Sequence, residues 1–499
     1  MKNLNELGVG LVYFQGFERF LESHSSLIDI VEIEPQTFWY DKNDECASFK
    51  FDEAVTGFLQ HYPRPKLFHG VGYPVGGTWL APQAHFNTLR QQAETLQPEW
   101  ISEHLSFNIF TEYGADVNSG FLLPPLQSSA GIATAVANIQ HYRAAMDRPF
   151  AFETGVNYLQ PRKNEIPDGL FTAKIAEQAD CHILLDLHNI LTNQRNGRQS
   201  VKDFVNSLPL ERVIELHVGG GIYYKDYYLD AHSGPSDDEL FGILDDVAGM
   251  LPNLKALMFE INPDYLVKVP EAAITEQLIK MHRIWDKRGR LLKKSIKPAP
   301  ENTPSFNESL SVPEWETTLG NLVLGRVPQF AASPVQEPTP VLTDELIQDP
   351  GITIIKDLIF NFRGSVLVTV LKLSTRLLRL SVGEAAFNTC INNFFASAVP
   401  ELLPVIVATQ FFEYVKANQL MGPRLQKVLE YEIAAIHTAI DQQPRTVSFD
   451  FDPLPLLAAL QDARLPGGPV VKRPVNLQIV SDQAVVTHEQ LNFSPVFHV

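Results

Sequence analysis

The feature that most constrains the fold is a series of short apolar, β-like runs that alternate with helical segments between residues 8 and 262. The eight runs are Gly8–Tyr13, Ile28–Ile33, Lys66–His69, Trp100–Leu105, Pro149–Glu153, Cys181–Asp186, Val213–Val218 and Leu254–Glu260. Strands that are separated by helices pair in parallel through right-handed crossovers. Eight such units predict a closed (β/α)8 TIM barrel, which is an α/β fold.

Helical segments between these runs have the expected period and caps. The residues from Pro82 to Leu96 and from Ser129 to Met146 are predicted helices. A third helix is predicted from Ser236 to Leu251, where the spacing of Ser236 and Glu239 indicates a capping box. The competing fold is an open doubly wound sheet. No Gly-x-Gly-x-x-Gly turn follows any of the runs, so nothing in the sequence supports a dinucleotide site.

At 499 residues the chain exceeds the size at which single cores stop growing, so more than one domain is expected. Prolines interrupt residues 293–344, which predicts a Pro-rich linker after a barrel of residues 1–292. Trp315, Leu319 and Leu322 indicate that the middle of this linker docks. Residues 345–499 are predicted to form a smaller, mainly helical α+β domain. It carries no cluster of ligand-type residues, which is typical of a binding or scaffolding module.

Composition excludes some classes of function. The formal charge of −18 argues against a nucleic-acid binder, which needs a basic face. Three cysteines form no disulfide framework and predict a reducing, cytoplasmic compartment. The first residues lack the apolar core of a signal peptide, and the most apolar stretch, 385–412, is interrupted by Pro400, Glu401 and Pro404, so no membrane span is predicted.

Polar side chains of metal-binding type stand at the ends of strands three to eight or in the loops that follow them. They are His69, Glu103, His104, Glu153, Asp186, His188, Asn189, His217, Asp230, His232 and Glu260. In a (β/α)8 barrel these strand ends converge on the face where active sites lie. So many carboxylates without Lys or Arg among them would repel one another, so the counter-charge should be metal.

The number of candidate ligands exceeds what one ion can hold, and two or three metals fit the count. Imidazole and carboxylate ligands without thiolate suit iron, manganese or zinc, with carboxylates bridging a cluster. Asn189 and Asn157 are of a type that can hydrogen-bond to metal ligands and orient them. Asn after a strand is also common in turns, and this alternative stays open for both residues.

The ordered motifs His69-Gly-Val-Gly, Ser102-Glu-His-Leu, Phe152-Glu-Thr, Leu185-Asp-Leu-His-Asn, Glu215-Leu-His-Val, Asp230-Ala-His and Phe259-Glu resemble a known family. They are similar to those of the multinuclear non-heme iron-dependent oxidative enzymes, which include the iron subunit of methanobactin biosynthesis and belong to the xylose-isomerase-like barrels. The resemblance covers residue 8 to about residue 290. Glu34 stands where relatives usually have His, and His188 where Asn is usual.

The resemblance implies an oxidoreductase with two or three irons in mixed Fe(II)/Fe(III) states. Such an enzyme uses dioxygen to modify a ribosomally made (RiPP) precursor peptide, commonly at cysteine. Carried over by position, the resemblance makes His69, His104, Glu153, Asp186, His217, Asp230, His232 and Glu260 iron ligands. It makes Glu103 and Asn189 ligands or residues that orient ligands. His188 and Asn157 are also predicted to orient ligands, and no catalytic residue is predicted beyond the metal ligands.

Within residues 345–499, the stretch from Leu380-Ser-Val-Gly-Glu-Ala-Ala-Phe to Phe395 and the motif Leu429-Glu-Tyr-Glu-Ile-Ala are weakly similar to partner proteins that recruit the peptide for members of this family. This similarity predicts a recruiting partner that has been fused to the barrel. The alternative to iron-dependent oxidation is a zinc- or manganese-dependent isomerase or phosphodiesterase of the same superfamily, with metal-activated water. Such enzymes usually bring a Lys or Arg to the barrel face, and none stands at these strand ends.

Overall fold

The structure, a computed structural model, describes residues 4–41, 49–266, 268–288, 310–326, 340–401, 404–420, 422–441, 443–468 and 471–480. These residues belong to two compact units, Met1–Asp357 and Leu358–Val499. Most of the predicted linker (293–309 and 327–339) lies outside the described residues, as does Cys46. The domain boundaries proposed at residues 292 and 344 therefore stay predictions.

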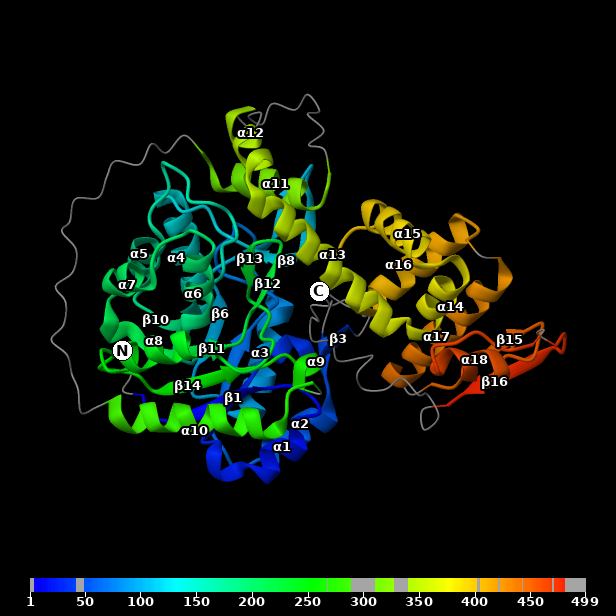
Figure 1. Ribbon diagram of the computed structural model, residues 1–499, viewed down its shortest axis with the longest axis horizontal. Coiled ribbons are helices and arrows are strands. Elements are labelled where there is room, and N and C mark those ends of the chain that lie inside the picture. Colours follow the sequence, from blue (N-terminus) through cyan, green and yellow to red (C-terminus); the bar gives the residue numbers. More distant parts are fainter. Residues whose placement is uncertain are drawn as a thin grey trace. The chain divides into compact units, whose positions relative to one another are not determined.

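The first unit contains a closed barrel of parallel strands (Figure 1). Around the barrel the strands are β1 (Gly8–Tyr13), β14 (Ala256–Glu260), β11 (Val213–Gly219), β10 (His182–Asp186), β9 (Phe150–Glu153), β6 (Ile101–His104), β5 (Lys66–Gly70) and β2 (Ile30–Ile33). Each of the eight predicted runs supplies one strand. The predicted TIM barrel is confirmed, together with the helical region that follows it.

Helices alternate with the barrel strands, as the sequence predicts. They are α1 (Glu18–Ser23), α2 (Glu53–His61), α3 (Gln83–Leu96), α4 (Ser129–Ala145), α5 (Asp168–Ala179), α6 (Leu187–Arg195), α7 (Val201–Asn206), α8 (Asp238–Ala248), α9 (Pro263–Leu266) and α10 (Glu271–Lys287). The predicted cap of α8 is wrong by one residue. The side chain of Asp237, not that of Ser236, accepts the N–H of Leu240. Asp and Ser are similarly good N-caps, so the sequence pattern alone does not choose between these neighbours.

Inside the barrel, an apolar layer supports the residues at the strand ends. Its members are Ile30, Leu67, Trp100, Ala151, Leu184, Ile214, Ala256 and Met258, all at most 1% exposed. Side chains of a strand return to the same face every second residue, so the next inward position on four of these strands carries His69, Glu153, Asp186 and Glu260. The period of the strand therefore places the polar layer directly above the apolar one.

Three hairpins extend the loops of the barrel. They are β3 (Trp39–Asp41) with β4 (Phe49–Phe51), β7 (Phe107–Glu112) with β8 (Ala115–Leu123), and β12 (Ile222–Tyr224) with β13 (Tyr227–Leu229). Part of the predicted linker is helix α11 (Val312–Val323), which packs on β7. The indole of Trp315 donates to Pro124 O at 2.9 Å, and Leu319 is fully buried. The middle of the linker is therefore docked on the first unit.

Two further helices lead out of the first unit: α12 (Pro340–Gln348) and α13 (Pro350–Val370), which crosses into the second. The second unit continues with α14 (Lys372–Val382), α15 (Glu384–Ser397), α16 (Pro404–Ala417), α17 (Pro423–Asp441), β15 (Arg445–Phe449), α18 (Leu454–Gln461) and β16 (Val475–Ile479). Strands β15 and β16 form an antiparallel pair beside α17. No helix in the described part of the chain combines the length and apolarity that crossing a bilayer requires.

Candidate metal centre

The ends of the barrel strands bring imidazole and carboxylate groups together at one end of the barrel. Four overlapping sets of three side chains have ligand atoms within 4.8 Å of one another. They are His69–His104–Glu153, Glu32–His217–Glu260, Glu153–Asp186–His217 and Asp186–His232–Glu260. Glu153, Asp186, His217 and Glu260 each belong to two sets, so the groups form one continuous cluster.

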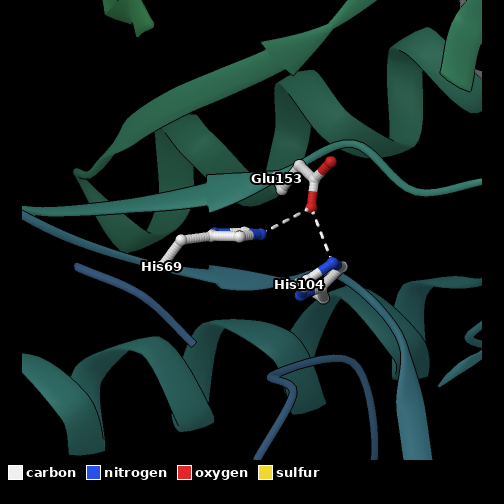
Figure 2. A group of neighbouring side chains, drawn as sticks. All are labelled: His69, His104 and Glu153. Atoms are coloured by element: carbon white, nitrogen blue, oxygen red, sulfur yellow. Dashed lines mark ion pairs between the residues drawn. The ribbon is translucent and has the colours of Figure 1, made fainter. Parts of the chain in front are cut away.

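Figure 2 shows the first set, in which two imidazoles from β5 and β6 face one carboxylate from β9. Oε2 of Glu153 lies 3.1 Å from Nε2 of His69 and 2.8 Å from Nε2 of His104. Nδ1 of His104 lies 2.9 Å from Gly70 O, which can only accept, so this nitrogen carries the proton. Nδ1 of His69 lies 2.8 Å from Ser102 Oγ, which itself donates to Phe68 O, so this nitrogen is also the donor.

Burial lowers the pKa of His104, but Glu153 and Glu103 raise it well above its ordinary value, so this ring is protonated when no cation is bound. In the neutral form that ligates metal, the protons stay on Nδ1 and both rings turn unprotonated Nε2 atoms toward the carboxylate oxygen. Three acceptors then face one another, and Glu153 Oε2 has no hydrogen-bond partner despite its burial. Two ligands at right angles around one ion, each about 2.1 Å from it, are about 3 Å apart. The spacings in this set fit a shared cation, and the donor set suits iron, zinc or manganese.

The second half of the cluster is organised by Glu260 at the end of β14. Its Oε1 lies 3.0 Å from Nδ1 of His217, and its Oε2 lies 2.8 Å from Nε2 of His232. Oδ1 of Asp230 is 2.9 Å from the same His232 nitrogen. Asp186 Oδ2, Asp230 Oδ1 and His232 Nε2 are buried without hydrogen-bond partners, as ligand atoms would be.

The electrostatics show how strongly this cluster needs positive charge. Burial raises the pKa of Glu153, but His104 and His69 overcome it and hold the pKa below its ordinary range. Burial likewise raises the pKa of Glu260, but His232 and His217 outweigh burial and hold this pKa well below its ordinary value. Burial and then the charge of Glu153 hold the pKa of Asp186 well above its ordinary value. The acids are therefore ionised only where positive charge, from imidazolium or metal, lies beside them.

Three other candidate residues lie close to the cluster or just outside it. Asn189 donates to Glu153 Oε1 at 3.1 Å, while its own Oδ1 is buried without a partner and can ligate. Nε2 of His188 lies 3.4 Å from Asp230 Oδ1, and burial lowers the pKa of this imidazole to about 4. Asn157 is not brought to the cluster. Its Oδ1 accepts from Leu159 N, which is the turn chemistry left open above.

Glu103 belongs to none of the four sets. Neighbouring residues of β6 face opposite sides of the barrel wall, so Ser102 and His104 point inward and Glu103 points toward the helices. There it accepts from the hydroxyl of Tyr142 on α4 at 3.1 Å. A Cβ on Gly70 would overlap Glu103 Oε2, so the carboxylate covers this glycine on the outer side of β5.

The structure adds one acid that the strand ends did not indicate, Glu32, and brings in Glu34, which directly follows β2 and stands where relatives usually have His. Glu32 is fully buried inside the barrel, and its Oε1 lies 3.2 Å from Nε2 of His217. Burial and then the charge of Glu260 raise the pKa of Glu34 to about 7, while His104 and His232 oppose the shift, which places Glu34 beside the cluster. The sequence signal was the alternation Val-Glu-Ile-Glu, in which both acids occupy one face of the strand.

Curated relatives match part of the chain. A UPF0276 protein of Caulobacter vibrioides is 23% identical over 242 residues, which are 48% of this chain and 82% of that protein. A UPF0276 protein of Acaryochloris marina is 26% identical over 225 residues, 44% of this chain and 79% of that protein.

Solved structures with similarity include D-psicose 3-epimerase from Clostridium cellulolyticum. It is 12% identical, with a TM-score of 0.36, and the match covers 57% of this chain and 99% of the epimerase. Endonuclease IV from Thermus thermophilus is also 12% identical, with a TM-score of 0.35 and coverage of 56% of this chain and 99% of the endonuclease.

A sequence profile matches residues 6–277, more than half of the 499 residues. The matched range contains every barrel strand and every member of the four sets. The profile describes RiPP precursor modification enzymes, that is, enzymes acting on ribosomally synthesised and post-translationally modified peptides. This chain therefore belongs to the family described as RiPP precursor modification enzyme MbnB/TglH/ChrH.

Proposed function

We propose that this chain is an iron- and dioxygen-dependent enzyme that oxidises a cysteine of a ribosomally made precursor peptide. The single observation that carries the proposal is the continuous cluster of His and carboxylate ligand atoms, many of them buried without hydrogen-bond partners. Within the described residues, no ion pair joins Glu153, Asp186, Asp230 or Glu260 to a Lys or Arg. The counter-charge then comes from imidazolium or from metal cations, and the buried ligand atoms without hydrogen-bond partners support metal. Membership of the peptide-modifying family supports a peptide as substrate.

The overlap of the sets supports two or three ions rather than one. Glu153, Asp186 and Glu260 each offer two carboxylate oxygens and each lie in two sets, which suits bridging between neighbouring ions. The proposed ligands are His69, His104, Glu153, Asp186, His217, Asp230, His232 and Glu260. Asn189 is proposed as a ligand or as the residue that orients Glu153.

The sulfur that reacts is proposed to come from the substrate. Iron held in this cluster would supply dioxygen activation and would bind a deprotonated thiolate. The four sets contain no cysteine among the described residues. Cys181 lies just before β10, at the opposite end of the barrel from the cluster, and burial raises the pKa of its thiol to about 12. Such a thiol is inert at neutral pH, so it does not compete for the metal.

The chain's own residues would hold charge at the site and leave space there. Glu153 and Glu260 keep their charge beside imidazoles and so hold positive charge in place. A Cβ on Gly219 would meet His232 Cδ2 at 3.1 Å, so glycine here leaves the ring of His232 room beside β11.

The Leu358–Val499 unit is proposed to recruit the precursor peptide. Its strands β15 and β16 pair only with each other among the described residues, so the pair offers edges to which an extended peptide can add. Fusion to the barrel keeps a bound leader at high effective concentration near the cluster. Hydrogen exchange on the full chain tests this: added peptide should slow exchange in residues 445–449 or 475–479. Unchanged exchange there together with turnover would contradict it.

The test of the proposed function starts from protein prepared without metal and loaded anaerobically with Fe(II), Zn(II) or Mn(II). Each sample is mixed with the precursor peptide encoded beside the gene, and oxygen is then added. The expected result is oxygen consumption and a changed mass at the peptide cysteine with iron alone. Product that forms anaerobically, or equally with zinc or manganese, would favour metal-activated water chemistry instead.

A further inference from the structure

Two acids lie one layer deeper in the barrel than the strand ends, where TIM barrels normally carry branched apolar side chains. One of them, Glu32, is also a member of the set Glu32–His217–Glu260. Glu32 comes from β2 and Glu215 from β11, and both are 0% exposed. Within the described residues, neither forms an ion pair with Lys or Arg, and both lie beside His217. Burying two carboxyls at this depth costs free energy, so their retention calls for a function or a strong partner.

His217 is the group that the two acids share. Its Nε2 lies 3.2 Å from Glu32 Oε1 and 3.5 Å from Glu215 Oε1. Its Nδ1 lies 3.0 Å from Glu260 Oε1, on the side of the cluster. A neutral imidazole has one N–H. Two carboxylates face Nε2 and one faces Nδ1, so a cation bound beside Glu260 would leave the proton on Nε2. Nδ1 then turns its lone pair toward Glu260 and the cluster.

This orientation is the reverse of that in His69 and His104, whose Nδ1 atoms donate and whose Nε2 atoms face Glu153. Those two rings are fixed by Ser102 and by a backbone carbonyl close to their own strands. Both ring nitrogens of His217 are buried without a hydrogen bond of that kind, and so are Glu32 Oε1 and Glu215 Oε1. These two acids are the nearest acceptors to Nε2, at 3.2 and 3.5 Å.

Glu215 is itself held in position. The indole Nε1 of Trp100 donates to its Oε2 at 2.8 Å, and Trp100 belongs to the apolar layer. The β10–β11 pairing shifts register between Ile183 and Leu184, so that Leu184 pairs with Glu215 and Asp186 with His217. This bulge skips Ile214 and aligns Glu215 and His217 with the inward side chains of β10.

We propose that Glu32 and Glu215 are positioning residues that keep the His217 proton on Nε2 and aim the Nδ1 lone pair at the metal centre. The inference rests on the proposed metal centre. Trp100 supports it indirectly by fixing Glu215. Carboxylates that accept from a ligating imidazole fix its tautomer and strengthen it as a ligand, and their loss typically weakens metal binding about 10–100-fold.

The test compares Glu32→Leu with Glu32→Gln in the full chain. Leucine fills the barrel interior but cannot accept from Nε2, whereas glutamine keeps an acceptor oxygen. We expect Glu32→Leu to raise or leave unchanged the Tm of the metal-free protein, because buried charge is removed. Its affinity for Zn(II), measured by competition with a chelator, should fall about 10–100-fold. Glu32→Gln should bind within a few-fold of wild type. A purely structural role predicts that stability and affinity fall together.

The tautomer itself gives a second readout. With ¹⁵N-labelled histidine in the Zn(II)-loaded protein, the ring of His217, assigned by its loss in His217→Ala, should show a protonated Nε2 and a metal-bound Nδ1. Glu32→Leu should speed the exchange of that Nε2 proton. Metal bound through Nε2, or wild-type affinity in both Glu32→Leu and Glu215→Leu, would overturn the inference. Failure of the wild type to bind metal would instead overturn the proposed function.

Discussion

The backbone N–H of Gln160 donates to Oδ2 of Asp349 at 2.9 Å, which ties the loop after β9 to the start of α13. The same loop contains Tyr158, whose hydroxyl accepts the N–H of Asp230 at 3.1 Å. The helix that leads out of the first unit is therefore linked through this loop to a proposed metal ligand. Contacts of Asp357 with Lys225 and Tyr224 tie the β12–β13 hairpin, which precedes Asp230, to the same helix.

Gly351→Ala tests this linkage. A Cβ at residue 351 would overlap Tyr158 O, so the helix or the loop has to shift. We expect a loss of about 1–3 kcal/mol in the free energy of unfolding of the first unit and weaker metal binding. Gly364→Ala in the same helix is the matched control, because its Cβ meets nothing within 4 Å and should stabilise by about 0.5–1 kcal/mol. Equal effects of the two substitutions in denaturant unfolding would count against the linkage.

Glu153→Gln tests the set shown in Figure 2. An amide cannot supply the charge that faces Nε2 of His69 and His104, so the variant should lose roughly tenfold or more in metal affinity. Metal content after dialysis against a chelator measures this. Glu94→Gln, on the exposed side of α3, is the control and should retain the wild-type content. Unchanged content in Glu153→Gln would remove this residue from the centre.

The contact of Glu316 with the barrel should make the stability of the first unit depend on pH. Burial raises the pKa of this carboxyl to about 7, although it accepts from the N–H and hydroxyl of Thr78. Glu316 therefore keeps its proton in the folded state at a pH where the unfolded chain has lost it, because an ordinary Glu has a pKa of about 4.3. Between these two pKa values the folded state binds more protons than the unfolded chain. The free energy of unfolding is therefore highest below the unfolded pKa, falls as the pH rises to about 7, and no longer changes above that pH through this group.

The expected size of this loss is at most about 4 kcal/mol, from the size of the shift. In Glu316→Gln the residue has no proton to lose, so this part of the pH dependence should vanish. Urea unfolding across the mildly acidic to neutral range, followed by Trp fluorescence, measures the difference between the two proteins. Parallel profiles for wild type and variant would show that Glu316 does not titrate in this window.

Glu432→Ala tests whether the second unit unfolds separately. The buried Glu432 carboxylate accepts from the N–H groups of Leu373 and Ser374 and from the Ser374 hydroxyl at the start of α14. Its loss leaves these donors buried and should destabilise the second unit by about 2–4 kcal/mol. All five tryptophans lie before residue 358, so their fluorescence reports the first unit alone. In Glu432→Ala, circular dichroism should show that the second unit unfolds at lower denaturant than in the wild type, while the midpoint of the fluorescence transition does not change. If the variant shifted both midpoints together, the two units would not unfold separately.

The period of two along a strand explains both what could be predicted from the sequence and what could not. Runs such as Leu67-Phe-His69 and Leu184-Leu-Asp186 indicate a strand and then place one polar group on its inner face. The same period turns Glu103 to the outer face beside Tyr142, but its Oε1 still lies 3.8 Å from Nδ1 of His104. Its role as a ligand or as a residue that orients His104 stays a prediction. Glu32 was missed because an acid in the middle of a strand carries no strand-end signal.

Tertiary contacts decide the remaining features. Trp315 and Leu319 indicated a docked segment, but the surface they pack on is set by the β7–β8 hairpin, which sequence patterns do not orient. The bulge beside Ile214, which aligns Glu215 with His217, is likewise a property of the pairing of β10 with β11.

We propose that the convergent imidazoles and carboxylates bind iron. The most direct measurement is anomalous scattering from crystals of the Fe(II)-loaded protein, recorded on both sides of the iron absorption edge. We predict two or three peaks that appear only above this edge, within bonding distance of the sets His69–His104–Glu153 and Asp186–His232–Glu260. No peak at these positions, or peaks whose strength does not change across the iron edge, would contradict it.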